Sequence, residues 1–255
     1  MLSSVKNALR VLEYLVKNGE GGVSEMGRSL ELSPGTVHRL VSTLVESGFA
    51  DQNAENRKYM PGTRILELAN AMRSRIEFLD LAHGHLERLM ERAGETVNLA
   101  VLRRSDVVYV DRVVSNQTLA VEVRIGSHVP AYCTALGKAL LAFGGREALD
   151  GYLERLDEIL QDEGHYKPNA AELKTELAKV KTQGYAEDNR EFSPDIMCVA
   201  APILNSRGRA IAAVSLSGPA TRFGARRESL VPMVEIAGKE LTLLLQALGE
   251  DSPSL

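Results

Sequence analysis

The chain has 255 residues, 44% of them hydrophobic and 25% charged, and a formal net charge of −4. This size and composition are typical of a folded protein with one large or two smaller domains, and the negative charge argues against indiscriminate binding to polyanions. No apolar run approaches the roughly 20 residues that span a bilayer and no secretory leader is evident, so we expect a cytoplasmic protein without a membrane partner.

The first part of the chain predicts three helices in succession. Apolar residues recur at helical spacing over residues 3–17, and the run GEGG at 19–22 ends this first helix. Ser24 is a candidate N-cap for a short second helix. Ser33 is a candidate N-cap for the third, with Pro34 at its first helical position.

The third helix, in SPGTVHRLVSTLVESGF, has two different faces. Apolar residues form one stripe, whereas the opposite face carries short polar side chains and hydrogen-bond donors. Such a face can approach base edges in the DNA major groove, so we predict a helix-turn-helix. Arg39 is the best candidate for a guanine contact; a helical hairpin with a solvated face is the alternative. The predicted DNA-contacting residues of this segment are Ser33, Gly35, Thr36, His38, Arg39, Ser42 and Thr43.

The segment FADQNAENRKYMPGTR that follows predicts a β-hairpin, or wing. Arg57 and Lys58 in its polar loop are expected to neutralise phosphates beside the groove. Residues 1–64 carry eight basic and seven acidic side chains, so this part is slightly less acidic than the remainder. We therefore predict a DNA-binding domain over residues 1–63.

Residues 64–80 are predicted to form a linker helix that also pairs two protomers. The apolar residues of this segment recur at a 4-3-4-3 spacing, which is typical of two helices packed side by side. An amphipathic helix that packs on its own domain fits the same spacing. The residues of this apolar seam are Ile65, Ala69, Met72, Ile76 and Leu79.

Beyond about residue 94 the hydrophobic pattern changes to the alternation typical of strands. The predicted strand segments are ETVNLAVL, DVVYVDRVV, TLAVEVRI, CVAAPIL and RAIAAVSLSGP. Helical stretches are expected at roughly 134–144, 145–160, 170–183 and 226–247. A sheet with covering helices predicts a second, α+β domain over residues 81–250.

The segment PAYCTALGKALLA could present an anion site. Thr134 can cap a helix whose first backbone N–H groups, at Ala135 and Leu136, are free to meet a carboxylate. The segment is not a nucleotide P-loop, because Ala139 stands where a P-loop has Ser or Thr. Considered alone, it fits an ordinary capped helix better.

A third group of polar residues lies beside or within apolar strands and could line a pocket. Ser215 and Ser217 share one face of a strand, because alternate residues do. Cys198 fits a buried small side chain or a pocket wall better than a nucleophile. The full group is Asp188, Glu191, Cys198, Ser215 and Ser217.

Enzyme and metal sites have little support in the sequence. The chain has no G-x-S-x-G elbow and no H-E-x-x-H metal helix. His128, Cys133 and Cys198 are possible metal ligands, but their spacing does not support a site, and reduced thiols are expected. We predict no cofactor, no metal and no catalytic residue, with a small-molecule enzyme bearing an accessory helical domain as the alternative.

Taken together, the motifs resemble the IclR family of bacterial transcriptional regulators over nearly the whole chain. The matching segments are SSVKNALRVLEYL, SPGTVHRLVSTLVESGF, YMPG, CTALGKALLA, GYAEDNREFSPDIMCVAAPI and VSLSGPATR. The resemblance implies a winged helix-turn-helix joined by a linker helix to a GAF-like domain, an antiparallel sheet flanked by helices. It also implies a ligand-responsive regulator, expected to be a repressor, that binds a palindromic operator as a homodimer or dimer of dimers.

The resemblance further implies that a small organic acid binds in the C-terminal domain. Carried over by motif, the pocket residues are the backbone of Ala135 and Leu136 and the side chains of Asp188, Cys198, Ser215 and Ser217. The chain departs from the family pattern at Asp195, where glycine is usual. We therefore expect a different loop conformation or local charge over the pocket, unless Asp195 faces outward.

Overall fold

The computed structural model describes residues 3–73, 77–117, 123–160 and 165–249. The chain divides into two compact units, Met1–Arg75 and Ile76–Leu255.

The N-terminal unit is a winged helix-turn-helix. Its elements in chain order are α1 (Ser3–Asn18), α2 (Val23–Leu30), α3 (Pro34–Glu46), β1 (Ala50–Gln52), β2 (Tyr59–Pro61) and α4 (Arg64–Arg73). The hairpin of β1 and β2 is antiparallel, with Asp51 opposite Met60. A small core of residues with 7% exposure or less holds the three helices and the wing together: Val11, Leu15, Met26, Val37, Val41, Ala50 and Tyr59.

Local chemistry explains where α2 and α3 begin. As predicted, the Ser33 hydroxyl caps α3 by accepting a hydrogen bond from the Thr36 N–H (3.2 Å), and Pro34 is the first helical residue. The prediction for Ser24 is wrong. Gly22 is the N-cap of α2, and its N–H donates to the Glu25 carboxylate at 2.9 Å, so the glutamate closes this end instead of a serine hydroxyl.

The segment predicted as one helix over 64–80 contributes to two helices, α4 and α5 (Glu77–Ala93). Leu79 is 4% exposed and lies in the core of the C-terminal unit, so this residue packs on its own domain. Ile76 and the side chain of Met72 lie outside the described residues. The pairing of protomers along this segment stays a prediction.

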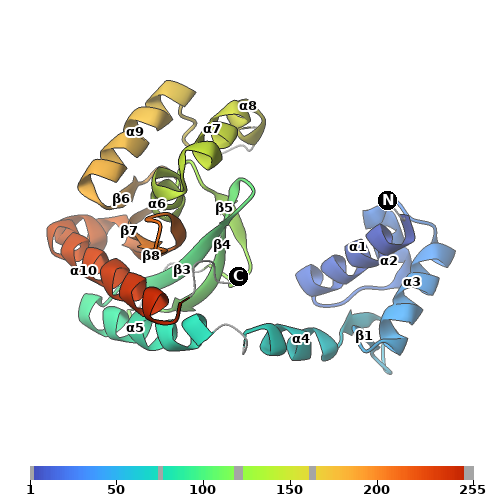
Figure 1. Cartoon of the computed structure of the whole chain (residues 1–255). Helices are drawn as coiled ribbons and strands as arrows, with labels where there is room; N and C mark the ends of the chain where they lie inside the picture. The colour runs from blue at the N-terminus through green and yellow to red at the C-terminus, as the bar shows by residue number, and fades with distance from the viewer. Residues whose placement is uncertain (1–2, 74–76, 118–122, 161–164, 250–255) are drawn as a thin grey trace. The chain divides into compact units, whose positions relative to one another are not determined.

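The C-terminal unit contains a six-stranded antiparallel sheet with the strand order β5-β4-β3-β8-β7-β6 (Figure 1). The strands are β3 (Thr96–Arg103), β4 (Asp106–Val113), β5 (His128–Pro130), β6 (Ala186–Asn189), β7 (Ile196–Leu204) and β8 (Ala210–Pro219). The predicted strand TLAVEVRI falls mainly on residues 118–122, which lie outside the described residues.

Helices cover both faces of this sheet. The helices α5 and α10 (Ala220–Ala247) pack on one face, and α6 (Ala135–Phe143) packs on the other. The remaining helices are α7 (Arg146–Glu154), α8 (Leu156–Ile159) and α9 (Ala170–Gln183). Two expectations are corrected: the helix predicted at 145–160 is interrupted at Arg155, and α10 begins six residues before position 226.

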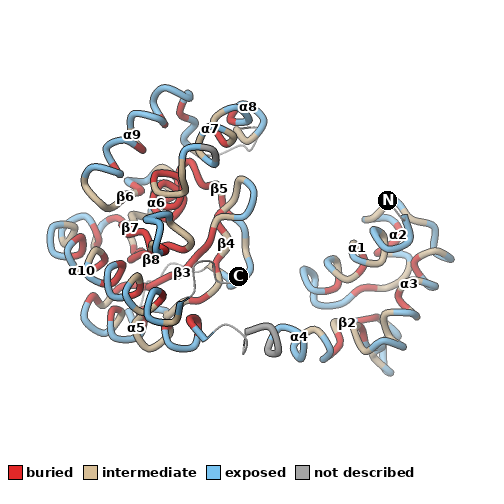
Figure 2. Tube along the Cα trace, viewed as in Figure 1, coloured by how far each residue is buried: buried red, intermediate tan, exposed pale blue. Residues whose placement is uncertain are grey.

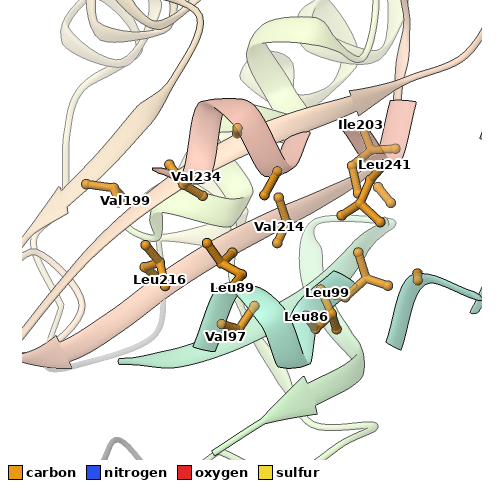
Figure 3. Packing of buried hydrophobic residues seen from close by; sticks show 14 of the residues in the cluster. Leu86, Leu89, Val97, Leu99, Val199, Ile203, Val214, Leu216, Val234 and Leu241 are labelled. Atoms are coloured by element: carbon orange, nitrogen blue, oxygen red, sulfur yellow. The ribbon is translucent and has the colours of Figure 1, made fainter. Parts of the chain in front are cut away.

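Strand alternation gives the two faces of the sheet different characters. The face towards α5 and α10 is mainly apolar, as Val214 and Leu216 of β8 illustrate (Figure 3). An exception is the buried Asp111 of β4, which pairs with His83 of α5 at 2.8 Å. The intervening residues Ser215 and Ser217 point to the α6 face, where both are buried. Figure 2 shows the sheet as mostly buried between its helical layers. Polar groups on its α6 face are therefore shielded from bulk water.

Candidate functional sites

The outer face of α3 is accessible along its length. Its polar side chains lie opposite the buried Val37 and Val41, and a methyl group added at Gly35 would meet no atom within 4 Å. Of the predicted DNA-contacting residues on this segment, Ser33, Gly35, His38, Arg39 and Thr43 are exposed, and Thr36 and Ser42 are half-buried. The helix therefore offers an open surface on which a nucleic-acid duplex can lie.

Three of these hydroxyl groups already have local partners. Ser33 caps α3 and also lies 2.8 Å from the Thr36 hydroxyl. The Thr43 hydroxyl donates to the Arg39 carbonyl at 3.1 Å. Among the residues that the structure describes, none is recorded in such a contact with the guanidinium of Arg39. The charge and planar donor set of this group are suited to a guanine edge.

The two basic residues of the wing differ in their surroundings. Arg57 is exposed and adopts a positive φ of 57° in the hairpin loop. Lys58 lies 3.4 Å from both Glu20 and Glu25, and these carboxylates raise the pKa of its ammonium group. Lys58 thus ties the wing to the start of α2, so Arg57 is the freer of the two to contact a phosphate.

The C-terminal unit contains a cavity of about 100 Å³ on the α6 face of the sheet. All six residues predicted for the effector pocket line it: Ala135, Leu136, Asp188, Cys198, Ser215 and Ser217. Six further residues complete the lining: Asn98, Tyr109, Val123, Thr134, Phe192 and Ile196. Positions separated by more than a hundred residues in sequence therefore meet at one site, while their role in binding stays a prediction.

The start of α6 forms one wall of this cavity. Thr134 caps the helix, as predicted: its hydroxyl accepts from the Gly137 N–H at 3.2 Å and donates to the Pro130 carbonyl at 2.9 Å. The N–H groups of Ala135 and Leu136 belong to the first turn, where no preceding helical carbonyl can accept them. These two donors and the helix dipole favour an anionic group at this wall.

The floor of the cavity is a hydrogen-bonded trio on adjacent strands. Asn98 of β3 is paired in register with Ser215 of β8. Its amide nitrogen donates to the Ser215 hydroxyl at 3.3 Å and to the Ser217 hydroxyl at 3.0 Å. Because both serine oxygens accept from Asn98, their hydroxyl hydrogens remain available to donate to a guest.

Asp188 supplies the ionisable group of the cavity. Burial raises the pKa of its carboxyl to about 6, although hydrogen bonds from the N–H groups of Glu191 and Phe192, at 2.8 and 3.3 Å, oppose this change. Burial also raises the pKa of the Cys198 thiol well above its usual value. Cys198 is consequently a neutral wall of the cavity and not an activated nucleophile.

The unusual Asp195 does not alter the charge inside the cavity. Its side chain is exposed, and its carbonyl accepts from the Ala220 N–H at 2.8 Å. The cavity lining does not include it. Asp195 therefore faces outward, and its backbone stabilises the junction of the β6–β7 turn with α10.

The described part of the chain offers no metal site. Within it, no three His, Cys, Asp or Glu side chains lie close enough to hold an ion. Of the candidate ligands weighed from sequence, His128 pairs instead with Asp106 at 3.4 Å. No helix among the described residues is long and apolar enough to cross a membrane.

Comparison with protein families accounts for both units. A model described as the IclR helix-turn-helix domain matches residues 4–54, and one for the C-terminal domain of bacterial transcriptional regulator IclR matches residues 70–242. The chain belongs to the IclR family. It is therefore a helix-turn-helix transcriptional regulator, and the enzyme alternative is not supported.

Curated relatives in the IclR family are similar over most of their length. The HTH-type transcriptional regulator XynR of Escherichia coli is 33% identical over 218 residues, which cover 85% of this chain and 86% of that protein. The acetate operon repressor of Salmonella typhimurium is 32% identical over 247 residues, covering 95% and 89%.

Solved structures of the family share the fold. Thermotoga maritima IclR is 33% identical, with a TM-score of 0.79 and coverage of 96% of this chain and 99% of that one. An IclR homologue from Microbacterium hydrocarbonoxydans, complexed with 4-hydroxybenzoate, is 25% identical, with a TM-score of 0.79 and coverage of 96% and 99%.

Proposed function

We propose that this IclR-family regulator is an effector-responsive repressor whose operator affinity changes when a small organic acid occupies the cavity of its C-terminal unit. The observation that carries the proposal is the convergence of twelve residues on one cavity, with amide donors at one wall and an ionisable carboxyl at another. A DNA-binding regulator acts where the chromosome lies, which supports a cytoplasmic location.

The DNA contacts are proposed for the outer face of α3 and for the wing. Arg39 reads a guanine in the major groove, the short side chains around it allow close approach, and Arg57 contacts a phosphate. Lys58 has a smaller part than expected from sequence, because Glu20 and Glu25 compete with phosphate for its ammonium group.

The effector is proposed to bind with its carboxylate at the start of α6. The N–H groups of Ala135 and Leu136 suit that anion, and the hydroxyls of Ser215 and Ser217 donate to its remaining oxygens. A volume of about 100 Å³ favours a small acid. The family member crystallised with 4-hydroxybenzoate supports an organic acid as the ligand class.

We also propose that the regulator binds a palindromic operator as a homodimer or a dimer of dimers. The helix α1 exposes Val5, Leu9 and Val16 to between 54% and 56%, and α4 exposes Leu66 to 66% and Leu68 to 45%. Exposed apolar side chains at this density on two helices of one small unit are typical of an association surface. A two-fold axis between protomers would match a palindromic site.

A DNA-binding titration tests the proposal. The probe is the duplex upstream of the regulator's own gene, and its mobility shift is compared with and without glyoxylate, pyruvate and 4-hydroxybenzoate. We expect at least one acid to change operator affinity by roughly fivefold or more, the usual range of coupling between ligands. If no acid changes the affinity and none binds by calorimetry, the effector part of the proposal fails.

A double variant tests the cavity without changing the DNA-binding surface. Replacing both serines, Ser215→Ala with Ser217→Ala, removes two donors from the cavity floor and should abolish the response to the acid while operator affinity without acid is unchanged. The matched control is Ser206→Ala, a serine in the turn between β7 and β8. An unaltered dose response in the double variant would exclude the cavity.

A further inference from the structure

The turn between β6 and β7, residues 190–195, closes one side of the cavity. Phe192 of this turn lines the cavity directly. The turn folds back on the end of β6, because the N–H groups of Glu191 and Phe192 both donate to one oxygen of Asp188. The cavity carboxyl and the turn are therefore one hydrogen-bonded structure.

Contacts from outside hold this turn in place. The ring of His165 stacks on that of Phe192, with centroids 4.6 Å apart and planes inclined by 16°, and its Nδ1 donates to the Phe192 carbonyl at 2.8 Å. The Tyr166 N–H donates to the Glu191 carbonyl at 3.1 Å. The shortest of these contacts is an ion pair, in which the Lys138 ammonium donates to Glu191 Oε1 at 2.6 Å.

Lys138 is unusual among the lysines because it is only 1% exposed. It lies on α6, two residues after Leu136 of the cavity wall. A buried ammonium group is costly without a counter-charge, and Glu191 is the nearer of its two partners, since Glu176 lies at 3.8 Å. The charge of Lys138 thus fixes Glu191, and Glu191 belongs to the turn.

The surroundings leave room for the turn to move when this pair is broken. Lys138 and Glu191 both line a second cavity, of about 370 Å³, together with Tyr166 and Asn189. Glu191 is partly exposed there, with 23% of its side chain accessible. Without its lysine partner, Glu191 can turn to solvent and carry the neighbouring Phe192 out of the cavity wall.

We propose that Lys138 is a positioning residue for the effector: by holding Glu191 it keeps the turn 190–195 closed over the bound acid. The inference rests on the proposed function, since it assigns the acid to the cavity beside Asp188. Lys138 acts through Glu191 and does not itself line that cavity. We call the Lys138–Glu191 ion pair the latch. The strength of this ion pair sets how slowly the bound acid dissociates.

Asp188 provides an internal reporter of the latch. Lys138 lowers the pKa of its carboxyl and Glu191 raises it. The other titratable groups packed around this region include Tyr109, Cys133, Cys198, Glu176, His165 and Tyr166. Removing the ammonium group should therefore move the titration midpoint of Asp188 upwards.

The test uses the full-length protein with Lys138→Met, which keeps the length of the side chain and removes its charge. We expect the amide hydrogens of Glu191 and Phe192 to exchange roughly tenfold faster in the acid-free protein. We expect the acid that binds best among glyoxylate, pyruvate and 4-hydroxybenzoate to bind roughly five- to tenfold more weakly, through faster dissociation. By NMR titration, the midpoint of Asp188 should rise.

Controls separate the latch from general destabilisation. Lys179→Met replaces an exposed lysine of α9 and should leave exchange, acid affinity and the Asp188 midpoint unchanged. Glu191→Gln breaks the same ion pair from its more exposed side. If Lys138→Met does not fold, Glu191→Gln replaces it in the measurements of amide exchange and acid affinity. In the double variant the two effects should not add, because both changes remove one contact.

The outcomes distinguish the two proposals. Unchanged exchange of Glu191 and Phe192 in both variants would overturn the latch whether or not an acid binds. Faster exchange with unchanged acid affinity would also overturn it, because the turn would not be closing over the acid. If no acid binds the wild-type protein, the proposed function fails, and with it the assignment of Lys138 to effector retention.

Discussion

At the scale of single residues, Asp188 makes the stability of the C-terminal unit depend on pH. The pKa of its carboxyl is about 6 in the folded protein against a usual value of 3.8, so the folded state holds the proton more tightly. Its contribution to stability is complete below pH 3.8 and is lost as the pH rises through about 6. The difference between these two pKa values corresponds to roughly 3 kcal/mol in the free energy of unfolding.

Asp188→Asn isolates this effect, because an amide oxygen can still accept from the N–H groups of Glu191 and Phe192 but does not ionise. The free energy of unfolding of the wild type, measured by urea titration relative to this variant, should fall between pH 4 and pH 7. The fall should approach the roughly 3 kcal/mol given by the two pKa values. A difference in unfolding free energy that stays constant over this range would mean that folding does not raise the pKa of Asp188.

A second residue-scale prediction concerns Arg39. If its guanidinium contacts a guanine through two hydrogen bonds, Arg39→Ala should weaken operator binding by about 1–3 kcal/mol and relax sequence preference at one position of each half-site. The measurement is fluorescence anisotropy with the operator and with single-base variants of it. Arg103→Ala, an exposed arginine of the C-terminal unit, is the matched control and should bind like the wild type. Equal affinity in Arg39→Ala would remove this residue from the recognition surface.

Only some of the residues that line the cavity could be predicted from the sequence. Ser215 and Ser217 stand out because polar groups alternate with apolar ones along a single strand. Asn98, which holds both serines, was missed because its place depends on the register between β3 and β8, whose contacting residues are 117 and 119 positions apart. Local sequence carries no information on that register. The outward direction of Asp195 likewise depends on how the turn packs.

At the scale of elements, the close approach of α6 to Ala131, the residue that follows β5, depends on Gly137. A methyl group at this position would lie 2.2 Å from the Ala131 carbonyl oxygen and 2.3 Å from its Cα, and both are backbone atoms that cannot rotate away. Gly137→Ala should therefore push the first turn of α6 out of place and lower the free energy of unfolding by about 1–3 kcal/mol.

Gly151 of α7 is the matched control for that change, since a methyl group there would meet no atom within 4 Å. Gly151→Ala should leave stability unchanged or raise it by up to about 1 kcal/mol, because alanine favours a helix over glycine. Urea denaturation compares the two variants. Equal stability of Gly137→Ala and the wild type would show that α6 can shift without cost.

Two helix starts that a local hydroxyl caps were predicted well, whereas the start of α2, which Glu25 closes through the Gly22 N–H, was not. The caps at Ser33 and Thr134 use a hydroxyl and an amide three residues apart, which sequence displays directly. The start of α10 is different: Pro219 precedes the helix without a side-chain cap, and the Ala220 N–H donates to the Asp195 carbonyl from another strand connection. Tertiary contact sets that boundary, so the helical pattern alone placed it too late.

The wing shows how tertiary contact changes the role of a residue within a correctly predicted element. The hairpin forms where expected, between β1 and β2. Lys58, however, lies between two carboxylates contributed by residues 33 and 38 positions earlier in the chain. Charge counting along the segment cannot reveal such partners, so Arg57 and Lys58 looked equivalent in sequence and are not equivalent in the fold.

At the scale of the whole molecule, the family architecture separates the DNA-binding surface from the cavity, since the two lie in different compact units. A regulator of this kind requires that the free energy of one site depend on occupancy of the other. The contacts described for α3 and for the cavity do not include a shared residue. The proposed coupling therefore does not rest on a residue that belongs to both sites.

Linkage makes this coupling testable without knowledge of its route. If an acid weakens operator binding by a given factor, the operator must weaken binding of that acid by the same factor, because both measure one free-energy difference. We expect a factor between about 5 and 150. Isothermal titration of the acid into the free protein, and into the protein saturated with operator duplex, gives the factor by which the operator changes acid affinity. Anisotropy of the labelled operator with and without saturating acid gives the factor by which the acid changes operator affinity. A duplex of scrambled sequence is the control. Two factors that differ beyond experimental error would mean that the acid acts at a site other than the one titrated, since a single cavity coupled to a single operator cannot violate reciprocity.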